Sequence, residues 1–253
     1  MKKEVMTSSL SAAGIRAILL DIEGTTTPIA FVHEVLFSYA RSRVRDYLTE
    51  YSGSVELLAD LAELRNEHAA DLKADLRPPA IVDGPHSSQT DSIVTYINWL
   101  MDRDRKSTGL KSLQGKIWRQ GYLDGTLKGQ LFADVAPALE RWRGAGLKIS
   151  IFSSGSSLAQ QLLFAHTEAG DLTRSIGNYF DTTAGSKIEV ESYRQIAAAL
   201  SLPAREVLFI SDLISELAAA SDAGMQTLLC VRPGNHPQGF PARYQTIQSF
   251  DEV

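Results

Sequence analysis

The chain has 253 residues, enough for one large domain or a core with a substantial insertion, and 44% of them are hydrophobic, as in ordinary globular proteins. Its 25 basic and 30 acidic residues give a formal charge of −5 and are interspersed, so nucleic acid is not expected as the principal partner. The single cysteine, Cys230, excludes an intrachain disulfide, and its apolar surroundings predict a buried thiol. Residues 7–9 interrupt the apolar stretch that a secretion signal needs, and no stretch approaches the ~18 apolar residues of a membrane span, so we expect a cytoplasmic protein.

The first predicted element is a buried strand over residues 15–20, followed directly by Asp21-Ile22-Glu23-Gly24-Thr25. Two carboxylates two positions apart therefore emerge where the strand meets solvent. Open α/β sheets bind ligands at the carboxyl ends of their strands, so this pair is a candidate for metal-assisted phosphoryl transfer. Taken alone, Asp21 has a second reading, as an ordinary turn aspartate.

The next part of the chain is predicted to be helical. Apolar residues recur at three- and four-residue steps from about residue 33 to 104, another helix is expected over 110–122, and convincing strand signals are absent from this part of the sequence. A lone strand at 15–20 has no partner among these helices. We therefore predict two domains: a core made of residues 1–30 and 128–253, and an inserted helical domain of residues 31–127 with hinges near Pro28 and residues 127–129.

From Asp134 onward, helices and strands alternate. Asp134 is the expected N-cap of a helix that runs through Arg143. The strands expected after it are 147–152, 207–210 and 226–231, and the helices follow Ser156, span about 189–200 and follow Asp212. Strands that alternate with helices indicate an α/β fold with a doubly wound parallel sheet of Rossmann-like type.

Polar residues recur at the ends of these predicted strands: Ser153-Ser154, Lys187, and Ser211-Asp212 with Glu216 one turn later. Each has a simpler interpretation: the serines as helix caps, Lys187 as a surface lysine and the acids as favourable charges at a helix start. Lys187 is not a P-loop lysine, because Asp181 stands where that motif requires glycine. Together, however, they supply the nucleophile, cation, hydroxyl donors and metal carboxylates that phosphoryl transfer needs.

The order of these motifs resembles the haloacid dehalogenase superfamily of phosphohydrolases. Within it, the chain is similar to the enolase-phosphatases of methionine salvage, on the evidence of four segments: 21–28 (DIEGTTTP), 127–135 (LKGQLFADV), 179–187 (YFDTTAGSK) and 231–235 (VRPGN). Most phosphatases of the superfamily carry aspartate two positions after the nucleophile. Glu23 at that position departs from the superfamily and agrees with the enolase-phosphatase branch.

The resemblance implies a magnesium-dependent site. Asp21 would be the nucleophile that forms an aspartyl-phosphate, with its other oxygen on Mg²⁺. Glu23 would supply a backbone carbonyl to the metal, and its side chain would protonate the leaving alkoxide and then activate water. Asp212 would be the second metal carboxylate. Glu216 would lie in an outer shell or help to position a metal-bound water.

The resemblance also implies the substrate contacts. Ser153 and Ser154 would bind the transferring phosphoryl group, Lys187 would offset its negative charge, and Thr25 would add a hydroxyl or only fix the turn. The enolase half-reaction needs a base, for which Glu23 and a residue of the helical insertion are both candidates. The insertion would act as a cap that excludes water from the enolised intermediate.

The implied function is a bifunctional enolase-phosphatase that converts 2,3-diketo-5-methylthiopentyl-1-phosphate to 1,2-dihydroxy-3-keto-5-methylthiopentene and phosphate. We therefore expect Mg²⁺ as cofactor, a small phosphorylated diketone as substrate, and a monomer that binds neither nucleic acid nor membrane. One alternative is a phosphatase of the same superfamily with another small phosphomonoester as substrate. More distant alternatives are a non-catalytic phosphoacceptor signalling module, which the long insertion between Asp21 and Lys187 disfavours, and a phosphate-binding protein that has lost catalysis.

Overall fold

A computed structural model describes residues 10, 13–83, 85–103, 105, 107–237, 239 and 243–253. The chain divides into two compact units, one of Met1–Val32 with Lys128–Val253 and one of His33–Leu127, which we call the α/β unit and the helical unit. The prediction that the helical insertion closes over the site concerns the relative placement of the two units and stays a prediction. The expectation that residues 7–9 belong to no secretion signal lies outside the described residues.

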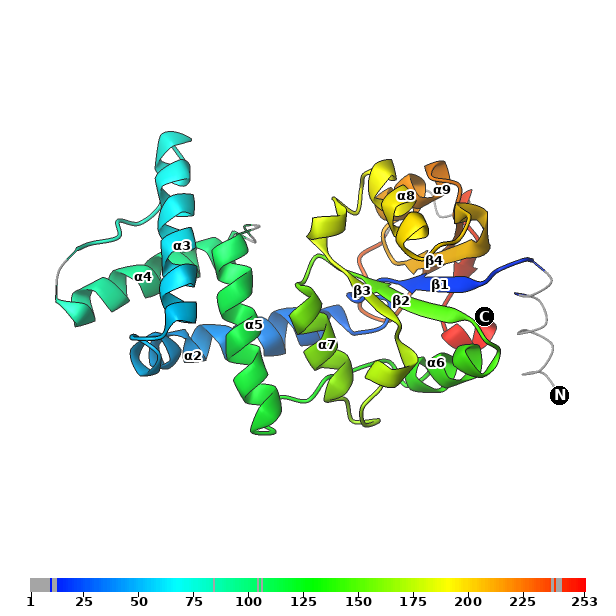
Figure 1. Cartoon of the computed structure of the whole chain (residues 1–253), viewed down its shortest axis with the longest axis horizontal. Coiled ribbons are helices and arrows are strands. Elements are labelled where there is room, and N and C mark those ends of the chain that lie inside the picture. Colours follow the sequence, from blue (N-terminus) through cyan, green and yellow to red (C-terminus); the bar gives the residue numbers. More distant parts are fainter. Residues whose placement is uncertain are drawn as a thin grey trace. The chain divides into compact units, whose positions relative to one another are not determined.

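The α/β unit is built on a six-stranded parallel sheet in the order β3-β2-β1-β4-β5-β6 (Figure 1). Its strands are β1 Ala17–Leu20, β2 Lys148–Phe152, β3 Asn178–Phe180, β4 Val207–Ser211, β5 Gln226–Cys230 and β6 Thr246–Ile247. All residues of β1 and β4 are buried, as expected for central parallel strands covered on both faces. The predicted doubly wound parallel sheet is confirmed.

Two strands, β3 and β6, were not predicted from the sequence. They are three and two residues long, too short for an apolar run or an alternation to show. Both lie at the edges of the sheet. The central strands were predicted to within two residues at each end.

Helices cover both faces of the sheet. The elements α6 Val135–Gly144 and α7 Ser157–Ala165 lie on one side, and α8 Val190–Ala199 and α9 Ile214–Asp222 lie on the other (Figure 1). Short 3₁₀ turns complete the unit: η2 Thr173–Ser175, η3 Thr182–Ala184, η4 Ala204–Glu206 and η6 Phe250–Glu252. The core between β4 and the helices α8 and α9 includes the fully buried aromatic residues Tyr193 and Phe209.

The predicted position of Asp134 at the start of α6 is confirmed, but its side chain has another role. Asp134 occupies the N-cap position, but its side chain makes no capping hydrogen bond. The carboxylate is instead paired with Arg232, and it accepts hydrogen bonds from the C-terminal turn η6. The charged guanidinium of Arg232 is a stronger hydrogen-bond partner for this carboxylate than a neutral helix amide.

The helical unit has only helices among its named elements. These are the π-helical turn η1 Phe31–Leu36, which starts in the α/β unit, and α2 Phe37–Glu50, α3 Val55–Lys73, α4 His86–Met101 and α5 Thr108–Leu123. Ser54 and Ser107 cap α3 and α5, each accepting a hydrogen bond from a main-chain amide of the first turn. The helices pack through buried apolar residues such as Leu57, Leu64 and Leu113.

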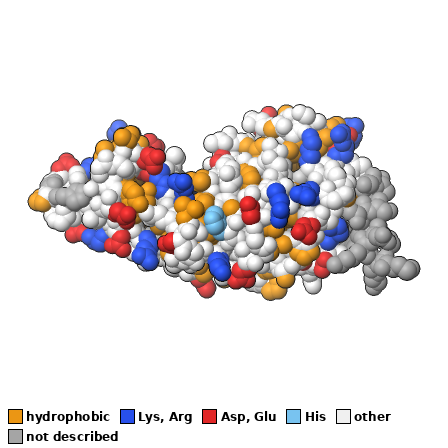
Figure 2. All heavy atoms as spheres, turned by 60° about the horizontal axis from the view of Figure 1, so that its bottom comes forward, with side chains coloured by type: hydrophobic (Ala, Val, Ile, Leu, Met, Phe, Trp, Pro, Cys, Tyr) orange, Lys and Arg blue, Asp and Glu red, His pale blue; other side chains and the backbone are white. Residues whose placement is uncertain are grey.

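The surface carries mixed charge. Acidic and basic side chains lie interspersed on the face drawn in Figure 2, over the described residues. Over the same part of the chain, no helix combines the length and apolar character needed to cross a bilayer. Cys230 is buried and reduced, as predicted from its apolar surroundings.

Candidate active site

The register of the sheet brings three predicted site residues together at the carboxyl ends of neighbouring strands. Leu20 at the end of β1 pairs with Ile151 of β2 and Ile210 of β4. The chain then leaves β1 at Asp21, β2 at Ser153 and β4 at Asp212. Because the order of the strands reverses at β1, these three chain ends surround a topological switch point, where open α/β sheets bind their ligands.

Lys187 lies at the centre of the charged groups. Its ammonium group pairs with a carboxylate oxygen of Asp21 and lies 2.6 Å from Oε2 of Glu216. The side chains of all three are at least nine-tenths buried. Burial by itself lowers the pKa of Lys187, but the charges of Asp21 and Glu216 outweigh it and raise that pKa above its ordinary value. Lys187 is therefore a buried ammonium and not the surface lysine of the simpler interpretation.

The position of Lys187 is fixed by its surroundings. It follows the turn η3, and the hydroxyl of Tyr193 in α8 donates to its main-chain carbonyl at 2.7 Å. Tyr193 is fully buried and packs against Phe152 and Phe209. A rigid aromatic residue of the core therefore holds the loop from which the lysine enters the site.

Carboxylates outnumber cations in this cluster. Asp21, Asp212 and Glu216 are all buried, whereas Lys187 is the one ammonium or guanidinium group paired with them among the described residues. Burial, followed by the charges of Asp21 and Glu216, raises the pKa of Asp212 to about 7. Burial and then the charge of Asp21 raise that of Glu216 to about 7, against the opposing effect of Lys187. The cluster thus has an excess of negative charge that favours a further cation.

This excess suits a divalent metal ion. Mg²⁺ is commonly held by one or two carboxylates together with water and phosphate oxygens, not by a complete cage of side chains. No group of three or more His, Cys, Asp or Glu arranged as a metal cage is found over the described part of the chain. The buried carboxylates of Asp21 and Asp212 could therefore hold Mg²⁺, with water and phosphate oxygens completing its octahedral coordination.

The loop after β1 is closely constrained. The amide of Gly24 donates to the carbonyl of Thr27 at 2.8 Å, and the hydroxyl of Thr26 donates to the carbonyls of Asp21 and Ile22, each at 3.2 Å. The Thr25 hydroxyl donates to Oδ2 of Asp21 at 3.5 Å. Both threonines are fully buried; the Thr25 hydroxyl contacts the Asp21 side chain, whereas the Thr26 hydroxyl holds the main chain of the loop.

The neighbouring residue Glu23 is exposed. Its side chain therefore differs from that of Asp21, which is 4% exposed. Exposure leaves the Glu23 carboxylate accessible to a substrate and to water.

Ser153 and Ser154 do not cap the helix after β2. Ser156 does so, accepting from the amide of Ala159 at 3.3 Å. Oγ of Ser153 accepts from the amide of Gly155 at 3.1 Å, and Ser154 is exposed. The capping interpretation is therefore wrong for both serines, and their hydroxyls lie in the loop at the same edge as Asp21.

Two supporting residues were not assigned roles from the sequence. Ser211, the last residue of β4, donates to Oε2 of Glu216 at 2.8 Å and so orients that carboxylate. Asp181 accepts from the amide and hydroxyl of Ser157 at 3.0 and 2.9 Å, which joins the loop before Lys187 to the start of α7. Their positions at a strand end and a turn were visible in the sequence, but their partners were not.

The chain is similar to known proteins in sequence and in fold. Residues 15–224 match the haloacid dehalogenase-like hydrolase family. The chain is 54% identical to an enolase-phosphatase E1 of Synechococcus elongatus, covering 94% of this chain and 98% of the relative. It is 44% identical to one of Pseudomonas aeruginosa, with coverages of 94% and 98%.

A solved structure agrees. The UTR4 protein of Saccharomyces cerevisiae is 32% identical and superposes with a TM-score of 0.76, covering 94% of this chain and 100% of that protein. Its similarity extends over both units, and the two bacterial relatives match over nearly their whole length. On its sequence, its sheet and the residues gathered at the switch point, the chain belongs to the haloacid dehalogenase-like hydrolases and, within them, to the enolase-phosphatases.

Proposed function

We propose that the chain is a Mg²⁺-dependent enolase-phosphatase of methionine salvage. It converts 2,3-diketo-5-methylthiopentyl-1-phosphate to 1,2-dihydroxy-3-keto-5-methylthiopentene and inorganic phosphate. The observation that carries the proposal is the buried cluster in which Lys187 joins Asp21 to Glu216 beside Asp212. The enolase-phosphatase relatives support the same reaction.

In the phosphatase half-reaction, Asp21 is the nucleophile. One of its carboxylate oxygens forms a bond to phosphorus while the bond from phosphorus to the substrate oxygen breaks. Thr25 and Lys187, which contact the two oxygens of this carboxylate, hold it in a single orientation. Lys187 also offsets the negative charge that gathers around phosphorus during transfer.

Glu23 acts as the general acid and then as the general base of the phosphatase half-reaction. Its exposed carboxyl group gives a proton to the leaving oxygen, and the resulting carboxylate then takes one from water. That water attacks phosphorus, releases inorganic phosphate and regenerates the Asp21 carboxylate. The hydroxyls of Ser153 and Ser154, in the loop after β2, donate to the phosphoryl oxygens.

The metal is held by Asp21, Asp212 and the Glu23 carbonyl. When bound, Mg²⁺ withdraws negative charge from the phosphate and polarises the substrate oxygen next to the carbon that loses a proton. Glu216 orients Lys187 through the 2.6 Å ion pair. An outer position for Glu216 agrees with its ion pair to Lys187 and with the hydrogen bond that it accepts from Ser211.

The enolase half-reaction requires removal of a proton α to a carbonyl. Glu23 and a residue of the helical unit are both candidates for this base. In the proposed enzyme the helical unit acts as a cap that excludes water. We also place the enzyme in the cytoplasm, and we expect a monomer because one chain supplies the groups named above.

The direct test is incubation of the pure protein and Mg²⁺ with the diketo phosphate. The proposal predicts equal amounts of phosphate and of the enediol, read by its conjugated absorbance, and loss of both in Asp21→Asn. Phosphate without enediol would favour the alternative, a phosphatase for another small phosphomonoester. A stable aspartyl-phosphate without turnover would instead favour a phosphoacceptor module.

A further inference from the structure

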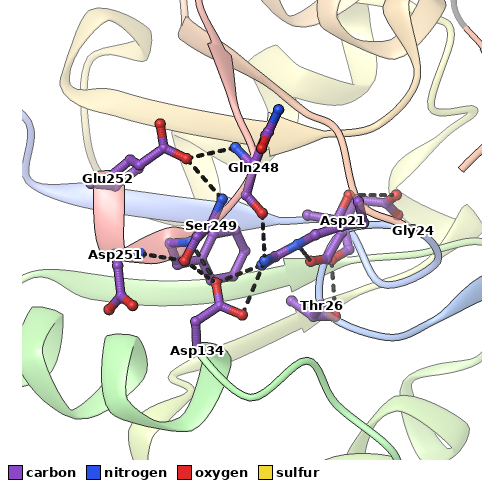
Figure 3. A network of polar contacts seen from close by, with 12 residues as sticks. Asp21, Gly24, Thr26, Asp134, Gln248, Ser249, Asp251 and Glu252 are labelled. Atoms are coloured by element: carbon purple, nitrogen blue, oxygen red, sulfur yellow. Dashed lines mark hydrogen bonds and ion pairs between the residues drawn. The ribbon is translucent and has the colours of Figure 1, made fainter. Parts of the chain in front are cut away.

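The segment after β5 reaches back to the loop that carries Asp21. Nδ2 of Asn235 donates to the carbonyl of Gly24 at 2.9 Å, and Nε of Arg232 donates to the carbonyl of Thr25 at 3.2 Å. Figure 3 shows this loop beside the C-terminal turn. Two side chains from one distant segment therefore hold two consecutive main-chain carbonyls, and we call Arg232 and Asn235 the carbonyl clamp.

The held carbonyls belong to a loop with little room to move. Gly24 has φ +69°, and a Cβ added to it would lie 2.5 Å from Oδ2 of Asp212 and 2.9 Å from Oδ1 of Asn235. The side chains of Asp212, one of the two carboxylates assigned to the metal, and of Asn235 thus occupy the space beside Gly24 that a side chain would need. A shift of a few tenths of an ångström at Gly24 changes the separation between the Asp21 loop and Asp212.

Arg232 is built to stay in one place. It is 6% exposed, and its guanidinium lies between the rings of Phe132 and Phe250, at 4.6 and 4.7 Å from their centroids. Nη1 donates to Oδ1 of Asp134 at 3.0 Å and to the carbonyl of Gln248 at 2.9 Å. Nη2 lies 2.8 Å from Oδ2 of Asp134, as an ion pair outside hydrogen-bond alignment.

The C-terminal turn also fixes the position of Asp134. Its Oδ2 accepts from the amide of Phe250 at 2.5 Å and from the hydroxyl of Ser249 at 3.1 Å. Ser249 and Glu252 form a capping box around this turn, which Figure 3 displays. The nucleophile loop is therefore tied, through Arg232 and Asp134, to the C-terminal turn of the chain.

Asn235 adds a second point of attachment. Its Nδ2 donates to the carbonyls of Gly24 and Cys230, at 2.9 and 3.3 Å, which fixes the orientation of the amide because the reverse would place oxygen against two carbonyl oxygens. Oδ1 is consequently turned toward the side of Gly24 that Asp212 also faces. The Nδ2 end of the amide therefore holds the loop, and Oδ1 is buried beside it without a hydrogen-bond partner among the described residues.

We propose that Arg232 and Asn235 are positioning residues, which hold the Asp21 loop at the separation from Asp212 that metal binding and phosphoryl transfer require. They touch neither the substrate nor the metal, and act through the carbonyls of Gly24 and Thr25. The part of this inference that concerns turnover rests on the proposed function. The part that concerns the metal does not.

A matched control exists in Arg141. Its Nη2 donates to the carbonyls of Phe250 and Val253 at 2.6 and 3.0 Å, so it anchors the same C-terminal turn. Its described contacts do not include the loop after β1. Arg232→Met and Arg141→Met therefore remove comparable anchors of the turn, but only the first releases a carbonyl of the nucleophile loop.

The experiment measures Mg²⁺ binding by calorimetry, and kcat and KM with the diketo phosphate at saturating Mg²⁺, in folded protein. We expect Arg232→Met and Asn235→Ala each to weaken Mg²⁺ binding about 10- to 100-fold, the usual effect of losing an outer partner of a metal site. kcat should fall and KM should change less than about twofold. Arg141→Met should lower the melting temperature but keep both Mg²⁺ affinity and kcat.

Arg232→Lys serves as the second variant, because it keeps a charge beside Asp134 while losing the forked donors. We expect it to fold with a melting temperature near that of the wild type and still to bind Mg²⁺ more weakly. Wild-type Mg²⁺ affinity in Arg232→Lys and Asn235→Ala would overturn the inference, as would an equal loss in Arg141→Met. A wild-type protein that binds Mg²⁺ but does not turn over the diketo phosphate would contradict the proposed function alone, and the Mg²⁺ measurements would still decide the role of the clamp.

Discussion

The two units of this chain treat buried charge in different ways. In the helical unit, the buried Asp71 pairs with Arg105 and accepts from the hydroxyl of Tyr96 at 2.9 Å. The buried Asp60 likewise lies 2.5 Å from Nζ of Lys116 and accepts from a serine hydroxyl at 2.7 Å. Each of these carboxylates has a cation of its own.

The carboxyl ends of the central strands in the α/β unit lack that balance. Three buried carboxylates gather there around Lys187, and two of them have pKa values raised to about 7. In a balanced pair the attraction between the two charges offsets part of the cost of burying them, so such a pair can serve the fold alone. An excess of buried charge of one sign destabilises the fold, so it indicates a site whose remaining partner is a ligand.

The largest expected effect concerns the single lysine of the edge. Lys187→Met leaves Asp21 and Glu216 buried without the cation that pairs with them, and the phosphoryl group loses its counter-charge. We expect phosphate release to fall at least about 10³-fold, the scale of losing one strong electrostatic group in an active site.

Lys116→Met is the matched change in the helical unit, where it breaks a balanced pair. It should lower the melting temperature and leave turnover per folded molecule within about threefold. Turnover of Lys187→Met within tenfold of the wild type would refute the assignment of Lys187.

A smaller effect, on the free energy of unfolding, distinguishes the buried ion pairs of the helical unit from the cluster around Lys187. Asp71→Asn removes the charged partner of Arg105. Because the Arg105 side chain is 43% exposed, we expect the free energy of unfolding to fall by about 2 to 3 kcal/mol, below the range for a fully buried pair. Urea unfolding of the metal-free protein measures it. An unchanged free energy of unfolding would show that this pair contributes nothing to the fold.

Asp212→Asn should change the free energy of unfolding in the opposite direction in the same assay. At pH 8 without metal it removes one of the surplus buried charges, and we expect a gain of about 1 kcal/mol or more in the free energy of unfolding. The same variant should lose the stabilisation that Mg²⁺ gives to the wild type. A metal-free variant less stable than the wild type would mean that Asp212 has a structural partner.

The pH dependence follows from the same raised pKa values. A carboxyl group with a pKa near 7 in the folded protein and near 4 in the unfolded chain favours folding below pH 4, and that stability is lost as the pH rises toward 7. The metal-free wild type should therefore become less stable between about pH 5 and pH 8. Added Mg²⁺ should flatten the curve, and a rise in metal-free stability over this range would contradict the raised values.

Much of the site follows from the alternation of strands and helices. In a parallel sheet the carboxyl ends of neighbouring strands share one edge, so Asp21, Ser153 and Asp212 could be placed together before any coordinates. The fold class and the central strands followed from buried apolar runs. The edge strands β3 and β6 did not, because two or three residues carry no periodic signal.

The contacts between loops could not be predicted. Lys187 stands in an irregular segment, and although the family resemblance placed it near the nucleophile Asp21, nothing in the sequence indicated that it would also pair with Glu216. Arg232 lies 207 positions from Thr25, and Asp134 looked like an ordinary helix cap. Such pairings depend on the packing of the whole unit, which no local pattern encodes.

The most direct test of the charge imbalance is calorimetric titration of the wild-type protein with Mg²⁺ alone. We predict one Mg²⁺ per chain, bound more tightly at pH 8 than at pH 5.5 because the ion displaces protons from Asp212 and Glu216. Binding should disappear in Asp212→Asn and persist in Asp71→Asn. The absence of Mg²⁺ binding, or binding that Asp212→Asn leaves intact, would contradict the claim that the surplus carboxylates of the sheet edge form a metal site.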